Sequence, residues 1–236
     1  MLQTSVKNKI KNLFSKMKGN TQKGMTYVEL IVVLSVFAII SSVSLFNYKV
    51  FQDKVDIQNL SADIALRIAK AQKDALSGYF PPAIAPYVSG ISGADWKPSY
   101  GIYFNVDSSV TNSDKSFYYF ADLNQDKKLF SSSSCSFVPV GTSSECFEQI
   151  NITKGNKIKE IKIHFRTDPA TNLILNNLHI TFTRPDSGAT FQSINAGVNT
   201  LVPPPFIDYA ELKVTNAGES VTSIIKVYPS GRIEIN

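Results

Sequence analysis

The sequence predicts an α+β fold: a long N-terminal α-helix, transmembrane in its first half, packed on an antiparallel β-sheet head. Three observations support this class. From Leu30 to Tyr48 the chain has nineteen residues without a charge, a Pro or a Gly. As a helix at about 1.5 Å per residue, that run reaches roughly the 30 Å of a hydrocarbon core. An amphipathic helical pattern follows it, and short strand-like runs fill the rest of the chain.

The first 24 residues form a basic segment. Six lysines and no acid lie there, and a cationic flank of this kind holds the N-terminus of a membrane helix in the cytoplasm. We therefore expect a single-pass protein of the cell membrane whose later residues lie outside. The formal net charge of +5 belongs to this segment, because without its six lysines the chain has 5 − 6 = −1. The charge predicts topology and does not indicate nucleic-acid binding.

Residues 49–77 are expected to continue the helix as an amphipathic rod. Charged residues separate the apolar positions, which recur at three- and four-residue steps. These positions are Ile57, Leu60, Ile64, Ile68, Ala71 and Ala75. The rod should end near Leu76, because Ser77-Gly78 can form a left-handed cap and Pro81-Pro82 cannot continue a helix. Residues 78–236 then form the β-rich head.

Glu29 is the feature that a plain membrane anchor does not explain. An acidic side chain at mid-bilayer costs on the order of 2.5 to 3.5 kcal/mol. Cutting the chain between Gly24 and Met25 would place a new ammonium four residues from Glu29. The same charge on a neighbouring subunit could pair with the carboxylate, so Glu29 is predicted to serve assembly.

The segment KGMTYVEL, residues 23–30, resembles the start of the type IV pilins and pseudopilins. That motif has a basic leader, a Gly, a cleavage point, an apolar residue, a Thr, and a Glu before a hydrophobic helix. The resemblance implies that prepilin peptidase removes residues 1–24 after Gly24 and methylates the amine of Met25. It also implies that Glu29 neutralises the N-terminus of an adjacent subunit. Two departures from the motif are visible. Met25 stands where many members have Phe, and the helix lacks the Pro that often interrupts it in major pilins, with Phe46 near that place.

A pilin-like fold and a structural role follow from the same resemblance. The chain would be a subunit of a type IV pilus or of a type II secretion-like pseudopilus, with residues 25–48 as its transmembrane and assembly helix. Its partners would be other pilin or pseudopilin subunits, prepilin peptidase and an inner-membrane assembly platform. Three alternatives stay open: a signal peptide cut near Ser42-Val43-Ser44, an uncleaved signal anchor, and a membrane-anchored binding protein that does not polymerise.

Strands are predicted after the helix. Tyr100 to Val106 and Phe117 to Ala121 are aromatic runs separated by a polar turn region, which indicates a hairpin. Further predicted strands are Ile158 to Phe165, Leu178 to Thr183, Thr190 to Ile194, Ala210 to Val214, Ser223 to Tyr228 and Arg232 to Ile235. The last two, with Gly231-Arg232-Ile233 at their turn, resemble the C-terminal hairpin of H-type minor pseudopilins and FimT-like minor pilins.

The two cysteines, Cys135 and Cys146, lie eleven positions apart in a Ser-rich segment. On the exported side of a membrane such a pair is predicted to form a disulfide. A metal site would need further ligands nearby, and neither histidine is close in sequence.

Asp122, Asn124 and Asp126 place oxygen side chains at alternate positions, as the start of an EF-hand-type calcium loop does. The match then ends, because Lys127 replaces the Gly of the sharp turn and Ser133 replaces the closing Glu. Calcium binding therefore requires ligands from elsewhere, such as Glu145 or Glu148. The other interpretation is a polar turn after a strand.

Two further functions are not favoured by the sequence. A lysine-rich stretch could contact phosphates, but it is more typical of a solvated edge strand. Its members are Lys154, Lys157, Lys159, Lys162 and Arg166. The chain has no GxSxG, HExxH, P-loop or GxGxxG motif, so we do not expect an enzyme.

Overall fold

A computed structural model of the chain describes residues 24–79, 98–129, 135, 145–166, 172–195, 198–201 and 207–236. The predicted leader, except Gly24, lies outside the described residues, and so do residues 80–97 after the helix. The structured chain divides at Val50 and Phe51 into two compact units. The division falls within one helix.

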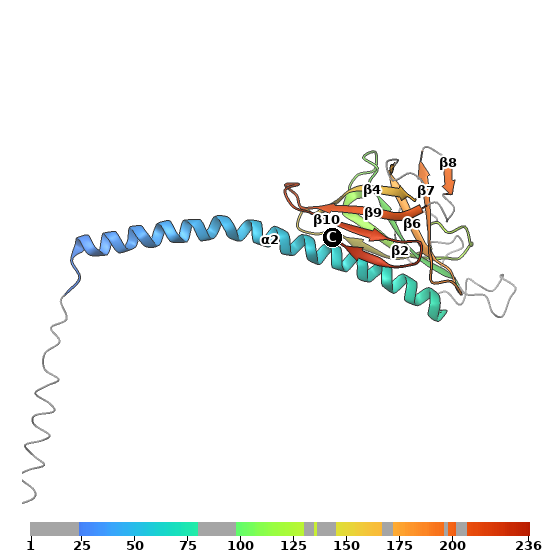
Figure 1. Cartoon of the computed structure of the whole chain (residues 1–236), viewed down its shortest axis with the longest axis horizontal. Helices are drawn as coiled ribbons and strands as arrows, with labels where there is room; N and C mark the ends of the chain where they lie inside the picture. The colour runs from blue at the N-terminus through green and yellow to red at the C-terminus, as the bar shows by residue number, and fades with distance from the viewer. Residues whose placement is uncertain are drawn as a thin grey trace, which may run out of the picture. The chain divides into compact units, whose positions relative to one another are not determined.

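Helix α2 runs from Tyr27 to Ser77 (Figure 1). Thr26 caps its start, where its hydroxyl accepts a hydrogen bond from the Glu29 amide at 3.2 Å. Gly78 follows its end with φ +60°, the left-handed backbone that a glycine adopts without cost. The end at Ser77 lies one residue beyond the one expected from the sequence.

The rest of the described chain forms strands and one short 3-10 helix. In chain order these are β1 Ser99–Asn105, η1 Ser113–Lys115, β2 Ser116–Asp122, β3 Cys146–Asn151, β4 Lys157–Phe165, β5 Asn172–Leu175, β6 Asn177–Phe182, β7 Ala189–Asn195, β8 Val198–Leu201, β9 Ile207–Thr215, β10 Thr222–Val227 and β11 Ile233–Ile235. They build two antiparallel sheets. The first has the order β3-β2-β1-β6-β7-β8 and the second β11-β10-β9-β4-β5.

The core of the second unit lies between these sheets and the last part of α2. Ile64, Ile68 and Ala71 of the helix are fully buried, and they belong to one cluster with residues of both sheets. The cluster begins at Ile57 along the chain. The apolar positions at helical spacing therefore face the strands, and most polar positions between them are exposed or half-buried, with Ser61 as a buried exception.

Polar contacts add to this packing. Arg67 of α2 pairs with Glu148 of β3 at 2.7 Å, and Lys154 pairs with Asp56 at 2.6 Å. The Tyr119 hydroxyl of β2 donates to Asp74 at 2.6 Å. These side chains fix the register of the helix along the sheets.

The predicted fold class is wrong in two respects. It assigned the first half of the helix to a membrane, and it gave the head one β-sheet. Within the described segments of the chain, no helix is both long and apolar enough to cross a membrane. The head has two sheets and the chain is mostly β.

The predicted location is corrected with it. A single-pass protein of the cell membrane with a cytoplasmic N-terminus needs a spanning helix, and the described residues provide none.

Candidate functional site

The start of α2 carries the residues predicted for cleavage and assembly. Gly24 is exposed, and a Cβ built on it would meet nothing within 4 Å. Met25 is 58% exposed. Glu29 lies in the first turn of the helix, where a negative charge is favourable beside the positive end of the helix dipole.

Glu29 also has a local role at the helix start, which the sequence-based prediction did not include. Thr26-x-x-Glu29 has the spacing of a capping box, in which a Thr hydroxyl accepts from the amide three residues later. That hydrogen bond is present. Glu29 therefore suits a helix start as well as an intersubunit pair, and the S/T-x-x-E pattern was readable from the sequence alone.

The first unit exposes apolar side chains around the helix. Their exposed fractions run from 45% at Leu30 to 79% at Tyr27. The set is Tyr27, Val28, Leu30, Ile31, Val32, Val33, Leu34, Val36, Phe37, Ile39 and Ile40. A helix that is apolar all round is normally buried against something, and exposed apolar patches of this extent mark interaction sites.

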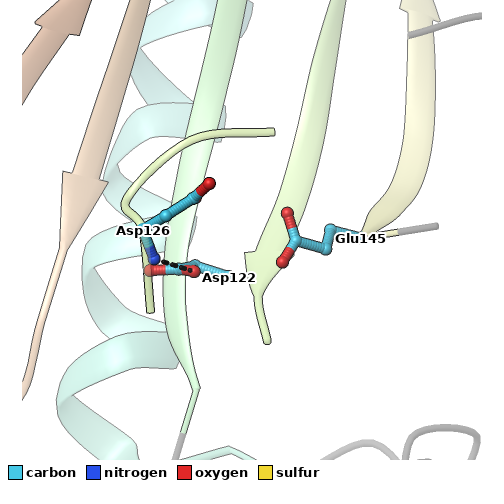
Figure 2. Close-up of side chains that lie close together, drawn as sticks. All are labelled: Asp122, Asp126 and Glu145. Atoms are coloured by element: carbon cyan, nitrogen blue, oxygen red, sulfur yellow. Dashed lines mark hydrogen bonds between the residues drawn. The ribbon is translucent and has the colours of Figure 1, made fainter. Parts of the chain in front are cut away.

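A second candidate site is an acidic loop, which we define as Asp122, Asn124, Asp126 and Glu145. Glu145 is the residue directly before β3. Figure 2 shows its carboxylate turned toward the loop that follows β2. One ligand atom from each of Asp122, Asp126 and Glu145 lies within 4.8 Å of the others. Oxygens bound to one calcium ion at 2.3 to 2.6 Å are at most about 5 Å apart, so the three carboxylates fit that ion.

Backbone amides hold the acidic loop in place. Asp122 accepts from the Asp126 and Lys127 amides at 3.1 and 3.0 Å. Asn124 Oδ1 accepts from Asp126 at 2.9 Å, and Glu145 accepts from the Leu123 amide at 2.9 Å. Lys127, at the position where an EF-hand has Gly, has φ +61°. The turn therefore takes the left-handed conformation although the residue is not Gly.

Burial dominates the electrostatics of this loop. Asp122 and Glu145 are each 1% exposed. Burial raises the pKa of Asp122 to about 6, the Lys127 amide opposes the rise, and the Asp126 charge adds to it. A bound cation would act in the opposite direction, because it favours the ionised carboxylate.

Glu148, the other ligand suggested by the sequence, has a different role. Its carboxylate pairs with Arg67 of α2, and it is not in the carboxylate group of the acidic loop. Of the two glutamates suggested by the sequence, Glu145 is therefore the one that lies with Asp122 and Asp126.

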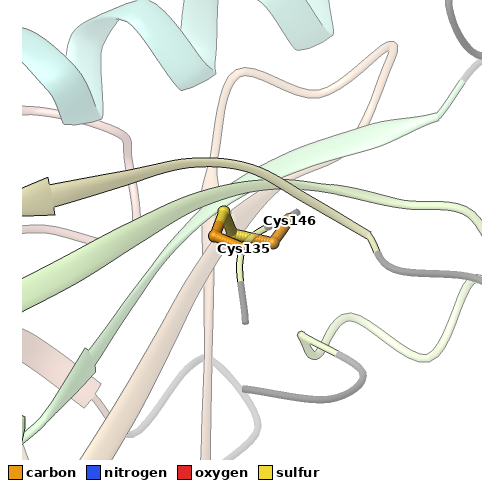
Figure 3. The surroundings of a disulfide bond; sticks show 2 residues. All are labelled: Cys135 and Cys146. Carbon is orange, nitrogen blue, oxygen red and sulfur yellow. A yellow bond between two sulfur atoms is a disulfide. The ribbon is translucent and has the colours of Figure 1, made fainter. Parts of the chain in front are cut away.

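The predicted disulfide between Cys135 and Cys146 is confirmed (Figure 3). Cys146 is 1% exposed and packs with Phe120 and Leu129. The bond closes a loop whose ends are 11 positions apart, which stabilises by roughly 3 kcal/mol in the chain-entropy model. Glu145 precedes Cys146, so the same bond restrains a residue of the acidic loop.

The lysine-rich stretch is paired with acids. Lys157 and Lys159 both contact Glu219, at 2.7 and 2.6 Å, and Lys162 contacts Glu160 at 2.8 Å. Hydrogen bonds from Lys157 and Lys159, and their charges, lower the pKa of Glu219 to about 2. The four lysines of the stretch therefore each contact an acid of the second unit.

No family model, curated protein or solved structure matches this chain.

Proposed function

We propose that the chain is a structural subunit of a filament of the type IV pilus or type II secretion-like pseudopilus class. The observation that carries the proposal is the apolar first part of α2, whose side chains from Tyr27 to Ile40 are exposed. Burying that area against neighbouring helices gains about 25 cal/mol per Å² of apolar surface. A filament of packed helices supplies such neighbours repeatedly.

Glu29 gives the packing its register. Cleavage after Gly24 by prepilin peptidase would free the Met25 amine beside the helix start, and a neighbour's Glu29 would neutralise it. Opposite charges attract more strongly in an apolar surrounding than in water, and a buried charge left without its partner is strongly unfavourable. Subunits would therefore join at one axial offset. Other subunits, prepilin peptidase and an assembly platform are the partners that this mechanism requires.

Mass spectrometry of the N-terminal peptide tests the processing step. In protein isolated from its source cells and from sheared surface filaments, we expect a peptide that begins at methylated Met25. An N-terminus elsewhere contradicts the cleavage. Processing without any filament form would instead support a binding protein that does not polymerise.

Replacing Glu29 by Gln tests the assembly step. The amide keeps the size of the side chain and removes its charge, so we expect Glu29→Gln to be processed normally and to enter filaments at least tenfold less. Glu160→Gln, which alters an acid in β4 of the head, is the matched control and should assemble as the original chain does. Equal incorporation of both variants contradicts the charge pair.

We further propose that the acidic loop binds calcium. Three carboxylates whose ligand atoms lie within 4.8 Å of one another support this, because calcium prefers oxygen ligands and takes six to eight of them. Asn124, backbone carbonyls and water would complete the coordination.

Thermal unfolding with calcium and with a chelator tests this second proposal. At a calcium concentration of about 100 Kd, binding stabilises by roughly 2.7 kcal/mol, which should raise the Tm by several degrees. Asp126→Asn, an exposed position, should lose most of the shift, and Asp208→Asn, outside the loop, should keep it. A Tm of the original chain that does not respond to calcium contradicts the proposal.

A further inference from the structure

Two Asn-x-Ser/Thr sequons occur in the described chain, Asn59-Leu60-Ser61 and Asn151-Ile152-Thr153. Neither has Pro at its middle position. This pattern is the acceptor for N-linked glycans, and it is used where it lies on the surface of an exported protein. The two sequons differ in how accessible their Ser or Thr hydroxyl is.

Asn151 lies where a strand meets a turn. It is the last residue of β3, and both Asn151 and Thr153 are exposed. The chain then turns back through Lys154 and Gly155, at φ +61° and +74°, and the Asn156 amide donates to the Thr153 carbonyl at 3.2 Å. Both polar side chains that define the sequon are therefore accessible.

The sequon at Asn59 is blocked in the folded chain. It lies in the middle of α2, and Ser61 is fully buried. The Ser61 hydroxyl donates to the Ile57 carbonyl at 2.9 Å. A transferase that needs the hydroxyl two residues after the Asn cannot reach it.

A groove of about 210 Å³ adjoins Asn151. Its lining includes the apolar Leu60, Ile150 and Ile152 and polar residues such as Asp63 and Thr153. A sugar ring has an apolar C–H face and a hydroxyl edge, so the first residue of a glycan on Asn151 can lie in this groove. The disulfide between Cys135 and Cys146 is typical of exported proteins that mature in an oxidising compartment.

We propose that Asn151 is an N-glycosylation site. The co-substrate is a glycan linked through pyrophosphate to a lipid. The Asn151 carboxamide nitrogen forms a bond to C1 of the first sugar, the bond from C1 to the pyrophosphate oxygen breaks, and the lipid pyrophosphate leaves. One proton of the carboxamide goes to a base of the transferase, and no atom is oxidised or reduced. This inference does not depend on filament formation.

Mass spectrometry of the full chain isolated from its source cells is the test. Trypsin should release residues 129–154 and 55–67, each with one sequon. We expect glycan mass on Asn151, located by fragmentation, and none on Asn59. A peptide 129–154 whose Asn151 is unmodified overturns the proposal. Sugar found only on its Ser or Thr residues overturns it too.

Variants expressed in the same cells separate the sequon from the segment around it. Asn151→Gln and Thr153→Ala should both lose the glycan completely. Thr153→Ser restores the acceptor pattern and should keep it, and Asn59→Gln should leave the mass addition unchanged. Glycan that persists on Thr153→Ala contradicts the proposal.

Discussion

His179 is a buried base within the first sheet. It is 2% exposed in β6, and its Nδ1 accepts a hydrogen bond from the Leu129 amide at 3.1 Å. The ring is therefore neutral with its proton on Nε2. Burial, with a smaller effect of Lys128, lowers its pKa from 6.5 to about 3.

The first prediction concerns acid stability. Because folding lowers the pKa of His179, this side chain is protonated at a higher pH in the unfolded chain than in the folded one. The stability contributed by neutral His179 is therefore complete above pH 6.5 and is lost as the pH falls toward 3. The free energy of unfolding should fall by at most about 1.4 kcal/mol per pH unit in that window. His179→Asn keeps an acceptor for Leu129 and cannot titrate. Denaturant unfolding at several pH values should show a smaller slope for this variant, and equal slopes contradict the assignment.

At the scale of elements, the C-terminal hairpin is fixed to the helix through one glycine. Gly231, in the turn between β10 and β11, has φ +84°. A Cβ there would collide with the Gln72 side chain and with the Ser187 carbonyl. Gln72 itself donates to that carbonyl at 2.8 Å. The turn, α2 and the chain before β7 therefore meet at a point with no room for a side chain.

Gly231→Ala is predicted to destabilise the head. A non-glycine residue in the left-handed region costs about 1–2 kcal/mol, and displacement of the Gln72 hydrogen bond adds about 1 kcal/mol. Chemical denaturation should show this loss. Gly218→Ala is the control, because the nearest atom to its Cβ would be 3.9 Å away, and it should stay within about 0.5 kcal/mol. An equal effect of the two changes contradicts the steric argument.

The strands absent from the sequence predictions share one property. They are β3, β5 and β8, and each lies at the edge of a sheet. β3 has mostly exposed or half-exposed positions, and β5 and β8 have four residues each. Such segments lack the apolar alternation that marks a strand, because their extended shape comes from pairing with a neighbour.

At the scale of the whole molecule, the two units differ in how far their apolar side chains are buried. The core cluster contains residues from Ile57 onward, and residues before Phe51 belong to the other unit. A helix segment without a core is stabilised by propensity and by partners. The second unit has its own hydrophobic core, as an independently folding domain does.

Removal of residues 1–50 is therefore predicted to leave the head folded. The Tm of the shortened chain, followed by circular dichroism of its strands, should lie within a few degrees of that of the full chain. Filament assembly should be lost, since the apolar segment is gone. A large fall in Tm would show that the first unit stabilises the head.

The sequence by itself determined the local features. Periodicity located the end of α2 within one residue of Ser77, alternating apolar residues located the paired strands in the middle of the sheets, and the presence of two cysteines predicted the disulfide. These depend on short-range spacing. Only the tertiary structure decided that the head has two sheets and that Glu145 joins Asp122 and Asp126. Those features depend on contacts between residues far apart in the chain, which local spacing does not encode.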